Sequence, residues 1–509
     1  MVKNVLTLSE KARLEYCCTV VRIEEIKPIE GSDFLGSTLV NGNPIVVRKD
    51  QIKEGDIMIY APIETVLNKE FLSVNNLFEI GERDRNSNFK EVAKLIEEGK
   101  KDEAKKLVGF FNKHGRVKLI RLRGCPSMGF LMEIESLVKW MPKLKDVDWE
   151  SLIGTDFDTI NDKLFVKVYV PFVPEQRVKN KHNKRDKKLK GFKRLVDGQF
   201  TFHYDTSQLQ RNIQRISPDD IVTISNKLHG SSAIFANILT RKPLQLSFMT
   251  FFFNKMINKK INHLSKNKKV NMNASKEISF LKKKIKPTFK LEYGNVYSSR
   301  TVIKNQYINQ GVSDGYYGTD IWAIYNEIIK PFIPKGYTIY GEICGYIDGS
   351  QKMIQKQYDY GMSEGESFLM IYRMTSTRED GTKKEWEVMD VKKWTEKLIK
   401  ENPQLQGKIV PIPVLYHGTL KDLYPNIDVN QHWHENVLEA LRTDKEHFGM
   451  EELEPQCKHS VPREGIVLRI SGDTVSEAFK LKTIRFLQKE GEAISNGEVD
   501  SEMVESYSE

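Results

Sequence analysis

Short strand-like stretches separated by turn signals dominate the beginning of this sequence, and they constrain its fold more than any other feature. Residues 19–26, 37–40, 44–48 and 55–61 combine β-branched or aromatic residues with polar ones. Asn41-Gly42, between the second and third stretches, is a strong hairpin signal. A succession of short strands joined by tight turns is typical of a small barrel, so we expect a β-barrel module here.

This first module is expected to span residues 1–170 and to contain a helical insertion. Between Phe89 and Asn112 the apolar residues recur near the helical period, which predicts a helix. Residues 118–123 (KLIRLR) alternate basic and apolar side chains, as a barrel strand with one basic face would. That face is typical of nucleic-acid contact, and an ordinary half-exposed strand is the alternative interpretation.

Composition changes mark the other boundaries. Residues 171–199 form a basic linker, which is either a solvated loop or a phosphate-binding segment. Residues 200–490 alternate strand and helix signals, which predicts an α+β domain. Within it, residues 254–290 are rich in lysine and asparagine, a composition seen in phage and AT-rich sources, and must loop out as an insertion. The acidic end, residues 491–509, is expected to be flexible.

The overall charge and the cysteines limit the function classes. The formal net charge is +10 and the sequence pI is about 9.0, which favours a polyanionic partner, either nucleic acid or a membrane surface. No apolar run approaches the ~18 residues needed to cross a bilayer, and the first residues lack a signal-peptide core. The five cysteines include no CxxC pair, so a zinc site or a disulfide framework is not expected. We therefore expect a soluble cytoplasmic protein without a membrane partner; no pattern indicates its oligomeric state.

Lys227-Leu-His-Gly230 is the first segment that suggests chemistry. It follows an alternating strand at Ile221–Ile224 and precedes another at residues 232–238. A lysine at a strand end can attack a phosphoryl group once it has lost its proton, so its pKa must be lowered by burial or nearby positive charge. Gly230 would let the backbone turn tightly beside a bound nucleotide. Alone, the segment also fits an exposed hairpin lysine.

Five further segments follow in order, and each places one or two candidate site residues on a strand or turn. They are Tyr297–Arg300 with its arginine, Thr338–Ile343 with Glu342, Ser367–Tyr372 with Phe368, Arg463–Arg469 with Glu464, and Ala478–Thr483 with Lys480 and Lys482. The last two lysines are two residues apart, so both point to one face of a strand.

This set and order of segments resemble the covalent nucleotidyltransferase superfamily, which contains ATP-dependent DNA ligases, RNA ligases and mRNA-capping enzymes. The segments match its motifs I, Ia, III, IIIa, IV and V. The motif sequences are similar to those of the RNA-ligase branch: KLHGSS, YGEICG, EGIVLR and FKLKT. Arg121–Gly124 with Ser127 and Gly129, followed by Gly198–Asp205, looks like the Deinococcus-type RNA ligase family. That resemblance implies an OB-fold module before a ligase domain, and it does not cover residues 254–290.

The resemblance also implies roles for the catalytic residues. Lys227 would take AMP from ATP, AMP would pass to a 5′-phosphate end, and a 3′-hydroxyl would then displace it. Lys482 and Lys480 would contact the α-phosphate, and Lys480 as a solvated strand lysine is the alternative. Glu464 would hold Mg²⁺ or Mn²⁺, ions that prefer carboxylate, phosphate and water ligands.

The remaining site residues would bind the nucleotide. Glu342 would accept from the ribose hydroxyls, Phe368 would stack on adenine, and Arg300 would contact a phosphate or the acceptor ribose. Surface ion pairing for Glu342 and core packing for Phe368 are the alternatives. Many relatives carry an acid directly before the lysine; here Asn226 could accept from the adenine amino group instead.

The expected function is therefore an ATP-dependent RNA ligase that joins 3′-hydroxyl and 5′-phosphate ends at nicks in RNA-containing duplexes, as in RNA repair. The alternatives are an ATP-dependent DNA ligase and a capping-type guanylyltransferase. The KxHG wording and the N-terminal barrel disfavour the DNA ligase. The short chain after Lys482 leaves no room for the C-terminal OB module that capping enzymes carry.

Overall fold

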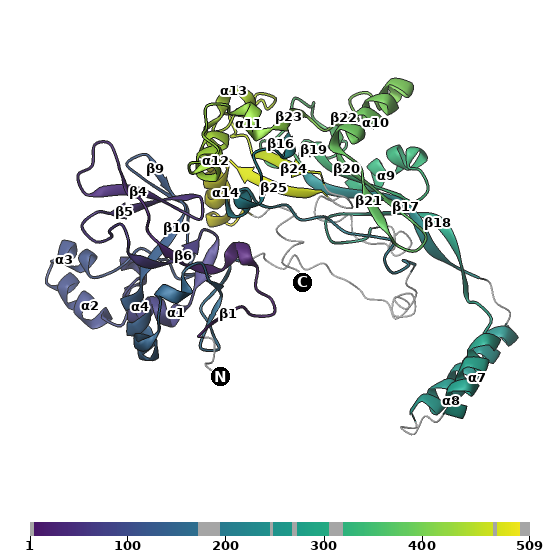
Figure 1. Ribbon diagram of the computed structural model, residues 1–509, viewed down its shortest axis with the longest axis horizontal. Coiled ribbons are helices and arrows are strands. Elements are labelled where there is room, and N and C mark those ends of the chain that lie inside the picture. The colour runs from purple at the N-terminus through teal and green to yellow at the C-terminus, as the bar shows by residue number, and fades with distance from the viewer. Residues whose placement is uncertain are drawn as a thin grey trace.

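The computed structural model describes residues 5–171, 194–244, 248–266, 272–304, 319–471 and 476–498. An N-terminal module lies beside a larger body of two sheets, and a pair of helices projects from the far end of that body (Figure 1). Most of the predicted linker and the end of the acidic tail fall outside the described residues. Within the described part of the chain, no helix has the length and apolar character that crossing a bilayer requires.

The first module is built from small antiparallel sheets. A four-stranded sheet has the order β10-β6-β2-β11, and a three-stranded sheet has the order β3-β4-β5. Apolar residues of β2, β4, β5 and β6 form one buried cluster between these two sheets. The strands are β2 (Cys18–Arg22), β3 (Lys27–Pro28), β4 (Leu35–Val40), β5 (Asn43–Arg48), β6 (Ile57–Pro62), β10 (Gly129–Glu133) and β11 (Asp156–Phe157).

Shorter elements complete this module around a second cluster of buried residues. The β1-β12-β13 sheet and the β7-β14 pair are also antiparallel. The strands are β1 (Leu6–Thr7), β7 (Thr65–Leu67), β12 (Thr159–Ile160), β13 (Lys163–Leu164) and β14 (Val166–Val168), and the covering helices are α1 (Lys69–Val74) and α4 (Ile134–Trp140).

The hairpin predicted at Asn41-Gly42 is confirmed. Val40 pairs with Asn43, and the two turn residues have φ angles of 47° and 69°. Both central residues of a type I′ turn require positive φ, which asparagine and glycine tolerate best.

Two local predictions in this module are wrong. Residues 89–112 are not one helix but α2 (Phe89–Glu97) and α3 (Lys101–Lys106), because the chain turns at Gly99 with φ at 78°. The 118–123 segment is not a barrel strand. Only Ile120–Leu122 (β8) is extended, and it forms an exposed two-stranded hairpin with β9 (Cys125–Ser127).

The second body consists of two sheets whose strands are mostly antiparallel. A five-stranded sheet has the order β15-β25-β24-β16-β23, and a six-stranded sheet contains the path β18-β17-β19-β20-β21, with β22 beside β20. The predicted α+β class is therefore confirmed. The strands are β15 (Ser207–Gln208), β16 (Ile221–Lys227), β17 (Ser231–Pro243), β18 (Phe289–Ser298), β19 (Tyr337–Gly345), β20 (Ser367–Thr377), β21 (Lys383–Glu385), β22 (Ile409–Pro411), β23 (Val414–Thr419), β24 (Gly465–Ile470) and β25 (Glu477–Lys482).

Helices cover each sheet and bury its apolar face. α9 (Ile321–Ile329) and α10 (Val388–Glu401) pack on the six-stranded sheet. The five-stranded sheet shares its core with α6 (Leu209–Asn212), α11 (Leu420–Leu423), α12 (Trp433–Thr443) and α13 (Lys445–Phe448). The connection from β16 to β17, residues 228–230, passes from one sheet to the other. The predicted lysine nucleophile therefore lies where the two sheets meet.

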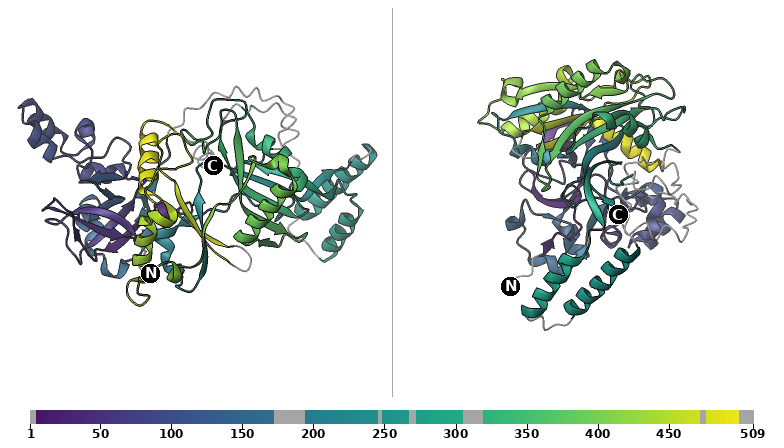
Figure 2. Two further views of the ribbon diagram at one scale, coloured as in Figure 1. Left: turned by 90° about the horizontal axis from the view of Figure 1, so that it is seen from above. Right: turned by 90° about the vertical axis from the view of Figure 1, so that its right-hand side faces the viewer.

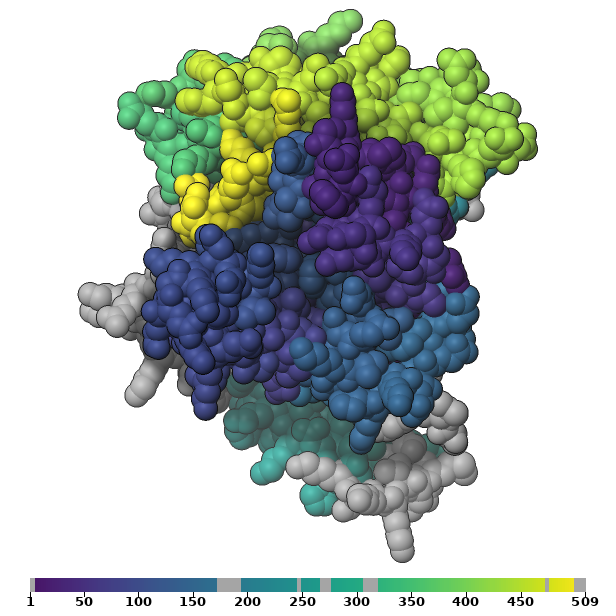
Figure 3. Space-filling model, turned by 90° about the vertical axis from the view of Figure 1, so that its left-hand side faces the viewer, coloured from purple at the N-terminus to yellow at the C-terminus, as the bar shows by residue number. Residues whose placement is uncertain are grey.

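The final helix, α14 (Ile484–Ser495), lies between the two bodies (Figure 2). Arg116 of the first module donates to Ser495 Oγ at 3.2 Å and to the Gly491 carbonyl at 3.5 Å. The yellow atoms of this helix border the first module in Figure 3. Residues 491–495, which the sequence analysis assigned to a flexible tail, are thus helical, because this helix has a neighbour to pack against.

The lysine-rich insertion forms two helices, α7 (Phe248–Lys266) and α8 (Met272–Lys284). They join β17 to β18, whose pairing continues to Pro243 and Phe289 at the outer end. The helix pair extends beyond the sheet, away from the first module (Figure 1).

Candidate functional site

Lys227 ends β16 and opens the connection between the two sheets. Its backbone pairs with Gly465 of β24, which follows Glu464. The Nζ atom of Lys227 lies 2.8 Å from Oε1 of Glu464, and Nζ of Lys482 lies 3.5 Å from that same oxygen. Strand pairing thus brings two predicted site lysines, 255 positions apart, to one carboxylate oxygen of Glu464.

The charges at this centre decide its protonation. Burial would raise the pKa of Glu464, yet Lys227 and Lys482 hold that pKa at about 2. Burial and Lys482 would lower the pKa of Lys227, but Glu464 and Glu342 hold it above its ordinary value. The lowered pKa expected for Lys227 is therefore wrong for the nucleotide-free protein, because a carboxylate lies in direct contact with the amine.

Gly230 shows why this connection needs a glycine. Its backbone passes so close to β19 that an added Cβ would lie 2.5 Å from the Ile343 carbonyl oxygen and 2.8 Å from Cγ of Glu342. The Gly230 N–H donates to Oε1 of Glu342 at 3.1 Å, and buried Gln355 donates to the Gly230 carbonyl at 2.7 Å. Glu342 is thereby placed beside the lysine segment.

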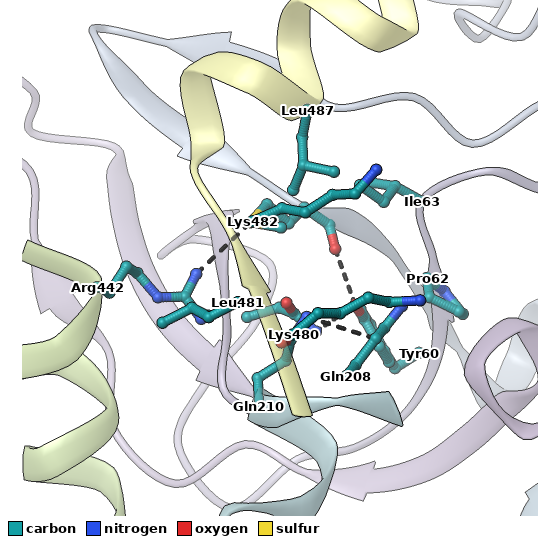
Figure 4. Close-up of a pocket in the computed structure, with 12 residues that line it drawn as sticks. Tyr60, Pro62, Ile63, Gln208, Gln210, Arg442, Lys480, Leu481, Lys482 and Leu487 are labelled. Atoms are coloured by element: carbon teal, nitrogen blue, oxygen red, sulfur yellow. Dashed lines mark hydrogen bonds between the residues drawn. The ribbon is translucent and has the colours of Figure 1, made fainter. Parts of the chain in front are cut away.

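Two lysines extend from β25 on the side opposite its core residues. Figure 4 shows Lys480 and Lys482 reaching in the same direction, toward Tyr60, Pro62 and Ile63 of the first module. The pocket between them lies at the junction of the two bodies. The prediction that both lysines share one face of a strand is confirmed by the alternation of buried and half-buried residues along β25.

Acidic partners hold both lysines in place. Glu490 of α14 accepts from Lys482 Nζ at 3.1 and 3.2 Å. Lys480 Nζ lies 3.7 Å from Oε2 of Glu15, a residue of the first module. Burial lowers the pKa of Lys480, and the charges of Lys482, Lys227 and Arg300 lower it further. The charges of Lys482, Lys227 and Arg300 therefore all act on Lys480.

Arg300 lies just after β18 and is held by a residue from the Gly198–Asp205 segment. Its Nη2 atom lies 2.7 Å from Oδ1 of Asp205. The Arg300 guanidinium lowers the pKa of Asp205, whose side chain is 80% exposed, below its ordinary value. Burial lowers the pKa of neighbouring His203 to about 3, so this imidazole is neutral near Ser232 and Tyr372.

Two buried oxygen atoms at this site accept no hydrogen bond from any described residue. They are Oδ1 of Asn226 and Oε2 of Glu464. A buried acceptor without a donor is costly, so each oxygen would gain from a bound partner; Oε2 of Glu464 also lies 3.8 Å from Nδ1 of His229. The amide oxygen suits a nucleobase amino group, and the carboxylate oxygen suits a divalent cation.

The described residues contain no cluster of three or more histidine, cysteine or acidic side chains arranged for a metal ion. A divalent ion at Glu464 would therefore take most of its ligands from water and phosphate. Mg²⁺ binds in this way in many phosphate-handling sites. The donor set fits the ion that the sequence analysis expected.

Phe368 lies on the face of β20 that meets Glu342 across the sheet. Its backbone pairs with Cys344, two residues after Glu342, so these side chains lie on one side of the sheet. The ring is only 5% exposed and packs edge-on against Tyr360, at 6.2 Å between centroids. Phe368 is therefore packed in a buried cluster that includes Leu228 and Phe486, as the core-packing alternative expected.

Several residues at this site were missed by the sequence analysis. Glu490, Glu15, Asp205 and Gln355 hold the predicted residues, and each comes from a segment outside the six motifs. Only Asp205 had a signal, since it ends the Gly198–Asp205 segment. The others depend on tertiary packing, for which a single sequence offers no pattern.

The chain is similar to one family model and to several solved structures. An OB-fold domain family model matches residues 17–85, within the first module. No curated protein matches the chain. Among solved structures, a lysine-to-alanine variant of Naegleria gruberi RNA ligase with ATP and Mn has a TM-score of 0.48 and 15% identity, covering 93% of this chain and 98% of that one.

Two further structures of Naegleria gruberi RNA ligase are similar. An apo variant has a TM-score of 0.49 and 15% identity over 94% of this chain and 99% of that one. The ligase with PPi has a TM-score of 0.46 and 14% identity over 94% of this chain and 100% of that one. At these TM-scores and identities, the activity of this chain has to be argued from its own residues.

Proposed function

We propose that this protein is an ATP-dependent RNA ligase that forms a lysyl-AMP intermediate on Lys227. The observation that supports this best is the contact of Lys227 and Lys482 with one buried carboxylate, Glu464, where the two sheets meet. A nucleophilic amine, a phosphate-binding cation and a metal-binding acid are the groups that nucleotidyl transfer needs at one point.

The first step would join Lys227 Nζ to the α-phosphorus of ATP and break the bond between that phosphorus and the pyrophosphate that leaves. Lys227 must first release the proton that Glu464 stabilises. Glu464 would hold Mg²⁺ or Mn²⁺ through Oε2, and such an ion neutralises phosphate charge. Lys482 and Lys480 would contact the α-phosphate once it replaces their present carboxylate partners.

The nucleoside would lie against the cleft wall. Oδ1 of Asn226 would accept from the adenine amino group, and Glu342 would orient the ribose hydroxyls. Gly230 would allow the backbone to approach the nucleotide, and Phe368 would stack on the base after a small movement of Tyr360. Arg300 would contact a phosphate or the acceptor ribose.

The later steps define the substrate. AMP would pass to a 5′-phosphate end, and a 3′-hydroxyl would attack that end, release AMP and seal a nick in an RNA-containing duplex. The domain arrangement that accompanies this function is an OB-like module at 1–170, a linker at 171–199 and a ligase domain at 200–490, as in Deinococcus-type RNA ligases. A preference for ribose at the 3′ end would come from its 2′-hydroxyl.

The test is label transfer with the full-length protein. We expect radiolabel from ATP, but not from GTP, to appear on the protein with Mg²⁺ or Mn²⁺ and then on nicked duplexes that carry RNA at the 3′-hydroxyl side. Lys227→Ala should abolish the adduct, whereas Lys384→Ala, at an exposed lysine of β21, should not. Label from GTP alone would favour a capping enzyme, and equal sealing of all-DNA nicks would favour a DNA ligase.

A further inference from the structure

Helices α7 and α8 together form a projecting helical segment, which we call the arm. Asn254 of α7 is buried at its base, where its side chain donates to the Lys286 carbonyl at 2.9 Å and accepts from the Lys286 N–H at 3.1 Å. Ile257 and Ile261, three and seven positions further along, are also buried. This spacing forms one apolar seam along α7. The arm therefore has a fixed base and a defined outer surface.

The outer surface exposes an unusual amount of aromatic and methionine side chain. Such groups are normally buried, and a cluster of them on a surface indicates a binding site. The exposed fractions are 78% for Met249, 60% for Phe251, 54% for Phe252, 47% for Phe253, 59% for Met256 and 58% for Phe280.

The same surface is strongly cationic. Among the described residues of segment 248–290, nine lysines are exposed and the one acidic residue is Glu277. Exposed Lys255 lies three positions after Phe252, and exposed Lys259 lies three positions after Met256, so cations and apolar groups share one helix face. On α8, Lys284 Nζ lies 4.4 Å from the centre of the Phe280 ring.

We propose that this arm binds the polynucleotide substrate away from the catalytic cleft, an inference that rests on the proposed ligase function. Lysines neutralise backbone phosphates, and exposed aromatic rings stack on unpaired bases. A helix that lies on a membrane instead separates an apolar face from a charged one. Interleaved lysine and phenylalanine therefore favour a nucleic acid as the occupant.

The position of the arm determines which substrates it can reach. β17 begins at Ser231, next to the lysine connection, and ends at Pro243, where the arm departs. Twelve strand steps of about 3.3 Å place the arm base roughly 40 Å from the cleft. At about 3.4 Å per nucleotide, only a substrate extending roughly a dozen nucleotides beyond the nick can touch both.

The experiment measures binding of nicked RNA duplexes by the full-length protein, with flanks of about 6 or about 24 nucleotides. Lys255→Glu/Lys259→Glu should weaken binding of the long substrate about tenfold. The slope of log binding constant against log salt concentration should fall by the amount expected for the loss of about two phosphate contacts. Phe252→Ala/Phe253→Ala should weaken binding of long substrates with single-stranded flanks about fivefold or more. Binding of the short substrate should not change.

Lys393→Glu/Lys397→Glu on α10 is the matched control, because these exposed lysines have the same spacing. Lysyl-AMP formation from ATP alone should be normal in every variant, since the arm is far from the cleft. If the wild type forms the adduct but the arm variants bind long RNA normally, the arm proposal is wrong. If only binding to anionic phosphatidylserine vesicles is lost, the arm is a membrane-binding element instead. An absent adduct in the wild type would overturn the ligase function itself.

Discussion

Lys227 carries a proton in the nucleotide-free protein, although its proposed task requires a neutral amine. The Glu464 carboxylate at 2.8 Å stabilises the ammonium form more than burial and Lys482 oppose it. Deprotonation of Lys227 near neutral pH therefore requires that another group neutralise the negative charge of Glu464. The second oxygen of the same carboxylate is buried without a hydrogen bond and lies 3.8 Å from Nδ1 of His229. Under the proposed function, Glu464 would both hold the lysine at rest and bind a divalent ion.

The first prediction concerns the pKa of Lys227. Glu464→Gln removes the main group that raises this pKa and leaves burial and Lys482, which both lower it. We expect the amine of the nucleotide-free variant to become neutral at lower pH than in the wild type. The pH dependence of the Lys227 reaction with an amine-selective acylating reagent, read by peptide mass spectrometry, measures this.

Lys384 is the internal reference for that experiment, since it is exposed and lies on β21. Its reactivity should follow the same pH curve in both proteins. An unchanged Lys227 curve in the Glu464→Gln variant would mean that the carboxylate does not control the amine.

Glu490 is the second residue whose charge should matter. Its carboxylate neutralises Lys482, which would otherwise face the α-phosphate. We expect Glu490→Gln to tighten ATP binding up to about fivefold, because this ion pair, whose side chains are 22% and 25% exposed, is still screened by water and is worth up to about 1 kcal/mol. Calorimetric titration of the Lys227→Ala background, which under the proposed function retains ATP binding without reaction, gives the affinity.

Glu492→Gln, at an exposed position of the same helix, should leave the affinity unchanged. Weaker binding in the Glu490→Gln variant would reverse the interpretation. Glu490 would then be a positioning residue that holds Lys482 in its phosphate-binding orientation.

At the scale of elements, the crossing between β16 and β17 depends on Gly230. An added methyl group would meet backbone and side-chain atoms of β19 at 2.5–2.8 Å, so the two sheets would have to shift. We expect Gly230→Ala to cost about 1–3 kcal/mol of stability. It should slow adduct formation roughly 100-fold, because a displacement of about 1 Å is large for in-line transfer.

Single-turnover adduct formation and urea unfolding measure the two effects. Gly81→Ala is the control, since a Cβ at that position would meet nothing within 4 Å and Gly81 has no left-handed φ. Adduct formation at the wild-type rate in Gly230→Ala would show that the connection can relax without moving Lys227.

Local patterns in the sequence predicted what local physics determines. The Asn41-Gly42 hairpin and the shared face of Lys480 and Lys482 follow from turn chemistry and from the strand period. The residues of the six motifs also lie near one another, although their roles remain predictions. What failed was the extent of each element, as at Gly99, where a left-handed glycine ends α2 inside an otherwise helical pattern.

The partners of the site residues could not be predicted from the sequence, for a different reason. Glu490 and Glu15 meet Lys482 and Lys480 only after α14 and the first module have packed beside β25. Contacts between distant segments depend on loop closure and on packing, and neither leaves a periodic signal. The raised pKa of Lys227 was missed for the same reason, since it depends on how closely Glu464 approaches.

At the scale of the whole molecule, α14 connects the first module to the lysines of β25. One side of this helix presents Glu490 to Lys482, and its backbone accepts from buried Arg116 of the first module. Arg116 also pairs with Glu64 at 2.6 Å and stacks on Tyr169 at 4.6 Å. A movement of the first module would therefore be transmitted to the charge beside Lys482.

The last prediction tests this junction through its pH dependence. Burial raises the pKa of Glu64 and Arg116 opposes that rise, so Arg116→Ala should raise this pKa further. A carboxyl whose pKa is higher in the folded state binds its proton more tightly in that state. Stability therefore falls as the pH rises from the pKa of the unfolded state to that of the folded state. We expect Arg116→Ala to lose about 3–5 kcal/mol at about pH 8 and clearly less at about pH 5, measured by urea unfolding. Arg116→Ala/Glu64→Gln removes the buried acid and should abolish the difference between the two pH values. If the difference persists in that double variant, Glu64 is not its source, and the junction is held by the contacts of Arg116 with α14.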